Sequence, residues 1–369
     1  MIYLDYQATT PLAPEAFQAM VPWLRDQHAN PHSAHAPGRA ARALVEVARE
    51  QVAALMPAGG TVNFTSGATE ALNWAIKGAG LKGVGPGRIV TIATEHAAVL
   101  DTVEALRAQG REVRVLPVGG DGLVDMDWAA AAITPGTALV ATMQVNNEIG
   151  VIQPIAALAA LARNAGALML CDAVQGYGRL LPPATADLIA VSAHKIHGPK
   201  GIGALWIRDG VALAPLMHGG GQEAGGRSGT LSPALCAGFG AAAALMLDGR
   251  DGDAAHVEQL WRAAAGALGD GWTINGAADA RYHGNLNIRR PGLDVGRLMS
   301  KLRDIAFSAG SACASGSGRP SHVLRALGLS DAEARSSIRI GFGRYSNEEE
   351  LVSSIVRIDA EAREQEGVA

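Results

Sequence analysis

The sequence is short of cysteine, of excess charge and of long hydrophobic runs. Three of its 369 residues are cysteine, an odd number that excludes a disulfide framework and favours a reducing compartment. No apolar run approaches the roughly 20 residues that a membrane-spanning helix needs. The N-terminus opens on Ile2–Asp5 without the basic and apolar regions of a secretory signal. We therefore expect a cytoplasmic protein without a membrane partner.

The balance of charges excludes further classes of partner. The 31 Lys and Arg residues are nearly matched by 35 Asp and Glu residues, which leaves a formal net charge of −4. The chain thus lacks the basic excess that nucleic acids attract. At 48% hydrophobic and 18% charged residues, the composition is typical of a globular protein with a sizeable core, and we expect two domains.

Short apolar or β-branched runs alternate with helical patterns between about residues 60 and 210. This rhythm predicts an α/β fold, with a large domain built on a mostly parallel seven-stranded sheet covered by helices on both faces. The predicted strands are Thr61–Thr65, Arg88–Ala93, Glu112–Leu116, Ala138–Val145, Ala167–Cys171, Asp187–Ser192 and Ala204–Ile207. The predicted helices include Ala97–Gln109, Ile155–Ala165 and, after a glycine-rich segment at 219–230, Leu235–Leu247.

The pattern changes beyond about residue 251 and predicts a smaller α+β domain. Its predicted strands are Tyr282–Ile288, Ile305–Ser308 and Ser337–Gly341, and its predicted helices are Asp294–Arg303, Ser321–Leu327 and a charged terminal helix from Asn347. The first dozen residues are expected to dock against it. We therefore assign 14–250 to the large domain, and 1–13 with 251–369 to the small one.

Two charged residues point to a particular chemistry. Lys195 follows the apolar run Leu188–Val191, and Asp172 comes directly after the preceding predicted strand, Ala167–Cys171. A lysine amine near a buried aspartate is what pyridoxal phosphate (PLP) needs, because the amine forms a Schiff base and the carboxylate keeps the pyridine nitrogen protonated. Either residue alone is weak evidence, since most strand-end aspartates form turns and most lysines are solvated.

The segment Asn63–Glu70 joins a predicted strand to a helix and is a candidate phosphate site. Gly67 permits a tight turn, after which the amides of Ala68 and Thr69 would point from the positive end of the helix toward an anion. A helix cap with Glu70 explains this segment equally well. Donors from other segments favour phosphate, namely Ser192, His194 and Thr230.

Further side chains are expected around the cofactor ring. His96 lies at a strand-to-helix turn, where an imidazole could stack on the ring and exchange protons near neutral pH, although a helix cap is the commoner role. Asn147 and Gln175 follow strands and could donate to the ring hydroxyl oxygen, while Asn146 and Asn147 also fit a simple turn. Because ligands bind at the carboxyl ends of parallel strands, these segments are expected to meet.

Cys313 lies in a small, polar stretch, Ser308–Pro320, unlike Cys171 and Cys236, whose apolar surroundings are typical of structural cysteines. About six residues on each side, at about 3.3 Å per residue, would let the thiol move roughly 20 Å. The thiol could then enter a buried site and carry an attached group back to the protein surface. A glycine-rich linker with an incidental cysteine is the alternative. Attack requires a thiolate, and how Cys313 would be activated is not evident.

Together these segments resemble the cysteine desulfurases among the class V, fold-type I PLP-dependent enzymes, almost from end to end. The matching blocks are Tyr3–Pro11, Asn30–His35, Phe64–Glu70, Thr94–Leu100, Asn146–Gly150, Asp172–Gln175, Ser192–Gly203, Arg227–Thr230, Gly310–Pro320 and Ser337–Arg339. The Gly310–Cys313 sequence is similar to the subgroup with a long, mobile cysteine loop. The family often has a His where this chain has Gln222.

The resemblance implies a role for each candidate residue. The implied catalytic residues are Lys195, which would hold the cofactor and shuttle protons, Cys313, and His96, which would stack on the ring. Asp172 would pair with the pyridinium, and Arg339 with Asn147 would bind the substrate. The other implied cofactor contacts are Gln175 and Asn147 at the ring oxygen and Ala68, Thr69, Ser192, His194 and, from a second subunit, Thr230 at the phosphate.

The activity implied by the resemblance converts L-cysteine to L-alanine and passes the sulfur to Cys313 as a persulfide. A protein acceptor such as an iron–sulfur scaffold would then receive the sulfur. The resemblance also implies an obligate homodimer with shared active sites. No resident metal site is expected, and whether Cys313 also ligates a transient iron–sulfur cluster stays open.

Two other functions fit the sequence. One is another class V enzyme, an aminotransferase or a selenocysteine lyase, in which Cys313 would be dispensable. The other is a catalytically silent sulfur carrier or scaffold that retains the fold. The presence of both Lys195 and Asp172 argues against the silent protein.

Overall fold

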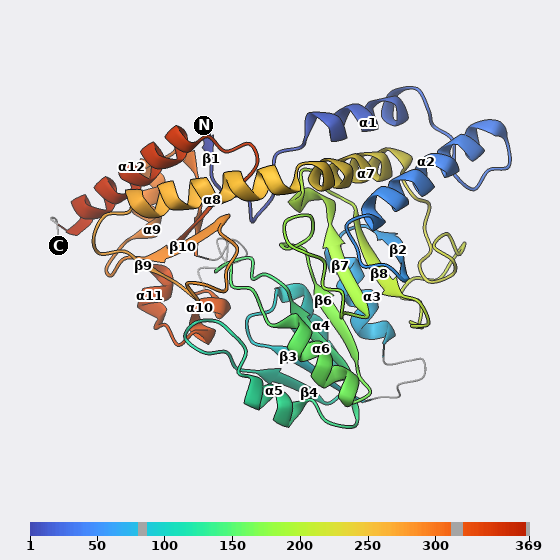
Figure 1. Cartoon of the computed structure of the whole chain (residues 1–369), viewed down its shortest axis with the longest axis horizontal. Coiled ribbons are helices and arrows are strands. Elements are labelled where there is room, and N and C mark those ends of the chain that lie inside the picture. Colours follow the sequence, from blue (N-terminus) through green and yellow to red (C-terminus); the bar gives the residue numbers. More distant parts are fainter. Residues whose placement is uncertain (80–86, 311–319, 367–369) are drawn as a thin grey trace.

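The computed structural model describes residues 1–79, 87–310 and 320–366 (Figure 1). Its larger part is built on a seven-stranded sheet with the strand order β2-β8-β7-β6-β5-β3-β4. The strands are β2 (Gly60–Thr65), β3 (Arg88–Ile92), β4 (Val113–Leu116), β5 (Thr137–Met143), β6 (Leu168–Asp172), β7 (Leu188–Ser192) and β8 (Gly203–Arg208). β8 is antiparallel to β2 and β7, and the other neighbouring pairs are parallel. The predicted α/β class with a mostly parallel seven-stranded sheet is confirmed.

Helices cover both faces of this sheet. They are α1 (Pro14–Arg25), α2 (Ala36–Ala53), α3 (Ala68–Gly78), α4 (Ala97–Ala108), α5 (Met126–Ala132), α6 (Ile155–Asn164) and α7 (Pro233–Asp248). Along β7, Ile189 and Val191 pack into the core with α2, α6 and α7, whereas Leu188 and Ala190 pack on the other face with α3 and α4. Burial on both faces explains why the strands read as continuous apolar runs.

The smaller part is an α+β unit with a separate core. A four-stranded sheet has the order β12-β13-β10-β9, with β9 (Thr273–Ile274), β10 (Asn285–Arg289), β12 (Ser308–Ala309) and β13 (Ser337–Gly341). Its helices are α8 (Arg250–Ala267), α9 (Val295–Lys301), α10 (His322–Ala326), α11 (Asp331–Arg335) and α12 (Glu348–Glu366). Leu260, Ile288 and Ile338 belong to its core.

The N-terminus lies against this smaller part. β1 (Ile2–Tyr3) pairs in parallel with β11 (Ile305–Ala306), and Leu4 is part of the same core. The single strand predicted at Ile305–Ser308 is wrong, because the chain switches there from β11 to β12, which belong to different sheets.

Two helices connect the parts. α7 ends at Asp248 and α8 begins at Arg250, and the two helices lie end to end in the upper half of the view, with α1 above α7 (Figure 1). The division between domains at 250 and 251 stays a prediction. Within the described ranges, no helix has the length and apolar character needed to cross a membrane.

Candidate active site

A cavity of about 520 Å³ lies at the carboxyl ends of several parallel strands. Ten residues predicted from the sequence line it, namely Ala68, Thr69, His96, Asn147, Asp172, Gln175, Ser192, His194, Lys195 and Arg339. Thr230 does not line this cavity in the same chain, and Cys313 lies outside the described residues. The fold therefore brings together segments that are far apart in the sequence, at the edge where α/β proteins bind ligands.

Lys195 and Asp172 follow neighbouring strands and face this cavity. Lys195 ends the short 3-10 helix η1 (Ala193–Lys195) after β7, and its Nζ donates to the carbonyl oxygens of Gln7 (2.5 Å) and Ala8 (2.7 Å). Asp172 ends β6 and is 6% exposed. Burial raises the pKa of Asp172, while the Val174 amide, His96 and Lys195 act to lower it. A cationic group in the cavity would favour the ionised carboxylate.

His96 caps a helix and also lies at the cavity. Its Nδ1 accepts a hydrogen bond from the Ala98 amide (3.0 Å) and so caps α4, and its ring also lines the cavity. Burial lowers the pKa of His96, with a further lowering from the charge of Lys195. The imidazole is therefore neutral near pH 7, which suits a stacking contact with an aromatic ring.

The turn between β2 and α3 leaves two backbone amides at the cavity without an acceptor among the described residues. The carboxylate of Glu70 accepts the Ser66 amide (2.7 Å), as in a helix cap, yet the amides of Ala68 and Thr69 have no acceptor among the described residues. A Cβ at Gly203 would lie 2.7 Å from the carbonyl carbon of Gly67, so β8 can pass this close only with glycine. The close packing of β8 thus fixes the start of α3, where the first amides have no intrahelical acceptor and lie at the cavity.

Arg339 and Asn147 are the two residues that were predicted to bind the substrate. Arg339 is 1% exposed, and it pairs with Asp5 (2.7 Å) and donates to the Asn147 carbonyl oxygen (3.0 Å). Its Nε is buried without an acceptor among the described residues. Asn146 forms the turn by donating to Thr94 and accepting two backbone amides, while Asn147 lines the cavity.

Gln175 and His194 already have protein partners. The Gln175 amide nitrogen donates to the Gln7 carbonyl oxygen (2.9 Å), so a bond to a cofactor oxygen would use its second hydrogen. His194 Nδ1 shares a hydrogen bond with Thr9 Oγ1 (3.1 Å). Burial and then the charge of Lys195 lower the pKa of His194 to about 4. His194 is therefore a neutral hydrogen-bonding group near pH 7.

Some residues of the cavity were missed by sequence reasoning. The carbonyl oxygens of Gln7 and Ala8 hold the Lys195 amine, and a backbone acceptor leaves no side-chain signal in a sequence. Lys200 and Gly201 also line the cavity. Their only signal was the match of Ser192–Gly203 as a block.

Thr230 lies at the end of a segment that is held on the surface of the larger part. Arg227 pairs with Glu70 (2.7 Å), and Gln222 accepts the Gly229 amide (2.7 Å). Thr230 itself is exposed. A contact between Thr230 and a phosphate would therefore need a cavity other than the one in its own chain.

Comparison with known proteins adds independent evidence. The model of a family described as aminotransferase class-V matches residues 2–353. The chain is 42% identical over 361 residues to the cysteine desulfurase IscS of Rickettsia bellii, and the matched region covers 95% of this chain and 88% of that protein. It is 45% identical over 362 residues to the IscS of Anaeromyxobacter dehalogenans, with 95% and 89% covered.

The fold gives the same result. A solved NifS-like protein has a TM-score of 0.89 at 32% identity and covers 97% of this chain and 98% of its own. The structure titled SspA in complex with cysteine has a TM-score of 0.83 at 35% identity and covers 94% and 100%. The chain belongs to the cysteine desulfurase family. The resemblance read from the sequence is confirmed, and so is the fold-type I architecture of a class V enzyme.

The site of this desulfurase-family chain fits PLP, the cofactor on which the family depends. The cavity joins a lysine amine, a buried aspartate and a neutral histidine. The amides of Ala68 and Thr69 have no acceptor among the described residues and suit a phosphate. The buried Nε of Arg339 likewise has no acceptor among the described residues. Among the described residues no group of three or more His, Cys, Asp or Glu could hold a metal ion.

Proposed function

We propose that this protein is a cysteine desulfurase that uses PLP to convert L-cysteine to L-alanine and collects the sulfur on Cys313. The main support is the meeting of Lys195 and Asp172 in one cavity of a chain 42% identical to a cysteine desulfurase. PLP, when bound, supplies an electron sink for bonds at the substrate carbons. Lys195 would hold PLP covalently. Asp172 would pair with its ring nitrogen, and the amides of Ala68 and Thr69 would bind its phosphate.

In this proposal Lys195 moves protons. Two backbone carbonyls, of Gln7 and Ala8, hold its Nζ at the cavity. From this position the amine can take a proton from the substrate Cα and return it to carbon. Asp172 supports the reaction by keeping a positive charge favourable at the ring nitrogen, and His96 covers the ring without adding a charge.

Arg339 and Asn147 would orient the substrate. The guanidinium of Arg339 is fixed by Asp5 and by the Asn147 carbonyl oxygen. Arg339 also lines the cavity, where it would bind a substrate carboxylate. Because Asp5 already offsets the charge of Arg339, we expect this contact to fix orientation more than affinity.

Cys313 would take the sulfur. Its thiolate attacks the sulfur of the substrate, so that an S–S bond forms as the C–S bond breaks. The electron pair of the C–S bond goes to the substrate carbon, which takes up a proton and leaves as alanine. The persulfide on Cys313 then passes sulfur to a protein acceptor.

The proposal includes an assembly and a location. We infer a homodimer in which Thr230 of one chain completes the phosphate site of its partner, since Thr230 is exposed and lines no part of its own cavity. The acceptor could be an iron–sulfur scaffold, and the cytoplasmic location read from the sequence belongs to the same proposal.

The test is a product assay with matched variants. Purified protein is incubated with PLP, L-cysteine and a thiol reductant, and alanine and sulfide are measured. Wild type should form both in equal amounts, and Lys195→Ala should form neither. Cys313→Ala should lose at least about a hundredfold in rate. Cys236→Ala is the control thiol, because burial raises the pKa of Cys236 to about 12 and it should not react.

The same assay separates the competing functions. If Cys313→Ala still forms alanine from L-cysteine at the wild-type rate, the persulfide step is wrong. With a second keto acid added as amino acceptor, its amination together with formation of the keto acid of the donor would show an aminotransferase. Wild-type protein without cofactor absorbance would show a silent carrier.

A further inference from the structure

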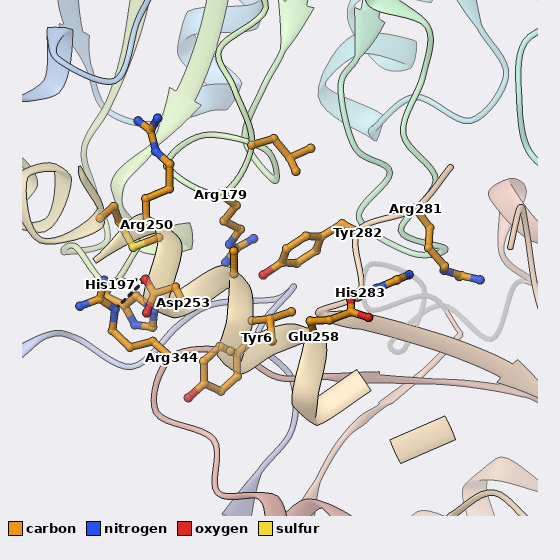
Figure 2. Close-up of a pocket in the computed structure, with 16 residues that line it drawn as sticks. Tyr6, Arg179, His197, Arg250, Asp253, Glu258, Arg281, Tyr282, His283 and Arg344 are labelled. Carbon is orange, nitrogen blue, oxygen red and sulfur yellow. Dashed lines mark hydrogen bonds and ion pairs between the residues drawn. The ribbon is translucent and has the colours of Figure 1, made fainter. Parts of the chain in front are cut away.

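A second cavity, of about 180 Å³, lies between the larger and smaller parts of the molecule (Figure 2). Its walls come from Gly178–Leu180 on one side and from α8 and Arg281–His283 on the other. Neighbouring residues line the two cavities, since Tyr6 faces this one whereas Gln7 faces the active site. The second cavity therefore backs onto the wall of the active site.

The charges of this cavity are unbalanced. Its described lining contains four arginines and two carboxylates, namely Arg179, Arg250, Arg281, Arg344, Asp253 and Glu258. Asp253 is already paired with Arg344 (2.5 Å), and Glu258 with His283 (2.5 Å). The remaining three guanidinium groups have no carboxylate partner among the described residues.

Arg281 shows the imbalance most clearly. It is 5% exposed, and its Nη2 donates to the carbonyl oxygens of Ile149 (2.6 Å) and Asn275 (3.1 Å). Its Nε and Nη1, like the Nε of Arg250, are buried without an acceptor among the described residues. Burial also lowers the pKa of Arg281 to about 10. Buried donors of a cation are costly without an acceptor, so Arg281 leaves a positive charge without a counterion among the described residues at the wall of the cavity.

Arg179 connects the cavity to the active site. Its Nη1 donates to the carbonyl oxygen (3.1 Å) and the Oε1 (3.0 Å) of Gln175, and its Nη2 donates to the Lys195 carbonyl oxygen (2.5 Å). Its guanidinium lies 5.4 Å from the ring centre of Tyr282. Figure 2 shows Arg179 and Tyr282 between Arg344 on one side and His283 on the other.

We propose that this cavity binds a small, doubly charged oxyanion, such as phosphate or a short dicarboxylate, and that Arg179 transmits its presence to the backbone of Lys195. Guanidinium groups bind planar or tetrahedral oxyanions through paired hydrogen bonds. Arg179 reaches the Lys195 segment directly, so an anion that orders Arg179 also orders that segment. Binding itself does not depend on the desulfurase activity.

The test uses the PLP-loaded protein, so that the phosphate cradle of the active site is filled. Inorganic phosphate, and separately malonate, is titrated by calorimetry at constant ionic strength in chloride. Two variants address the cavity. Arg250→Gln removes an unpaired guanidinium, and Ala254→Glu adds a carboxylate at an exposed lining residue of α8. Ala255→Glu is the matched control, because Ala255 is the next residue, is exposed and does not line the cavity.

Wild type and Ala255→Glu should bind one anion per chain with the same affinity, and the tighter of the two probes identifies the class of ligand. Arg250→Gln and Ala254→Glu should each bind about tenfold more weakly or worse. Hydrogen exchange of the amides in 193–196 should slow with phosphate in wild type and not in Ala254→Glu. Absence of saturable binding of either ion in wild type, or equal binding by Ala254→Glu and Ala255→Glu, would overturn the site. Binding without slower exchange would overturn the role of Arg179.

Failure of this proposal and failure of the proposed function give different results. Alanine formation by Ala254→Glu without added anion should stay within about twofold of wild type, as expected for a surface substitution. If wild type binds the anion but forms no alanine, the proposed function has failed and the anion site stands.

Discussion

At the scale of single residues, the structure distinguishes the protonation states of two buried acids, Glu95 and Asp172. Glu95 is fully buried, and its Oε1 accepts the Met143 amide (2.7 Å). Burial, and then the charge of Asp172, raise the pKa of Glu95 well above its ordinary value. Asp172 has His96 and Lys195 nearby, which act to lower its pKa. Burial raises the pKa of Asp172 as well, but Lys195 favours its charged form, whereas the charge of Asp172 disfavours ionisation of Glu95. We therefore assign the charge to Asp172 and the proton to Glu95.

Replacement of Asp172 tests this assignment. Asp172→Asn removes the charge that favours a cationic ring nitrogen, and we expect alanine formation to fall by about two orders of magnitude. Glu95→Gln is the matched control, since an amide resembles the protonated acid, and it should keep the rate within about threefold. Cofactor absorbance is recorded for each variant. Equal losses in the two variants would contradict the assignment.

A second residue-scale prediction concerns pH. Burial lowers the pKa of His197 to about 4, whereas in an unfolded chain it is about 6.5. The unfolded state therefore binds the proton first, so the contribution of His197 to stability is full above about pH 6.5 and is lost as pH falls toward about 4. His194 acts in the same window.

The measurement is urea unfolding at about pH 7 and about pH 5. Between them His197 should account for a loss of about 2 kcal/mol in the free energy of unfolding. His197→Asn, which tolerates the positive φ of 68° at this position, should lose correspondingly less over this interval. His28→Asn, at an exposed position, should behave like wild type. An unchanged pH dependence in His197→Asn would contradict the buried neutral imidazole.

At the scale of elements, an ion pair connects the start of α3 to the segment that ends at Thr230. The Glu70 and Arg227 side chains are each 12% exposed. Although burial alone would raise the pKa of Glu70, hydrogen bonds from Arg227 and Ser66 hold it below its ordinary value. The element proposed to bind a phosphate and the segment proposed to contact a partner chain are thus joined by this ion pair.

Glu70→Gln keeps the acceptor for Ser66 and removes the charge opposite Arg227. We expect it to lower the free energy of unfolding by about 2 kcal/mol and to weaken PLP binding several-fold. Glu112→Gln is the control, because Glu112 is 49% exposed and solvent screens its pairs with Arg88 and Arg114, which should therefore contribute much less to stability. Urea unfolding and a PLP titration are the measurements, and equal effects of the two variants would contradict the argument.

The elements also show what the sequence could predict. The seven strands of the large sheet were found within about two residues, because strands buried on both faces form short apolar runs that stand out. α8 was not predicted, since Gly252 and Gly266 and its many charges obscure an apolar stripe. The division of Ile305–Ser308 depends on β1, which is far away in the sequence, and no local pattern contains that information.

For the site, polar side chains and the amides at the start of a helix were predictable, whereas isolated backbone acceptors were not. Of the ten residues around the cavity, most were found because polar side chains at strand ends have recognisable chemistry. Ala68 and Thr69 were found as amides at a helix start, and Arg339 came from the family resemblance alone. The carbonyl oxygens of Gln7 and Ala8 were not found, because any residue supplies such an acceptor. Arg179 was also missed, since its partners are mainly backbone oxygens.

At the scale of the whole molecule, each site is proposed to need two chains. Thr230→Ala alone should weaken PLP binding about tenfold, the value of one hydrogen bond to a charged group. A mixture of Thr230→Ala and Lys195→Ala chains should recover activity, because a mixed dimer contains one site with Lys195 from one chain and Thr230 from the other. The measurements are PLP titration and alanine formation after co-refolding. Lack of recovery in proven mixed dimers would contradict the shared site.

The central claim is that sulfur moves from L-cysteine to Cys313 at the cavity around Lys195. The most direct test is the mass of the PLP-loaded chain, and of its peptides, after one turnover with L-cysteine in the absence of reductant. The account predicts one alanine released per chain and the mass of one additional sulfur atom on the peptide containing Cys313, with Cys171 and Cys236 unchanged. Release of alanine without sulfur on Cys313 would contradict it.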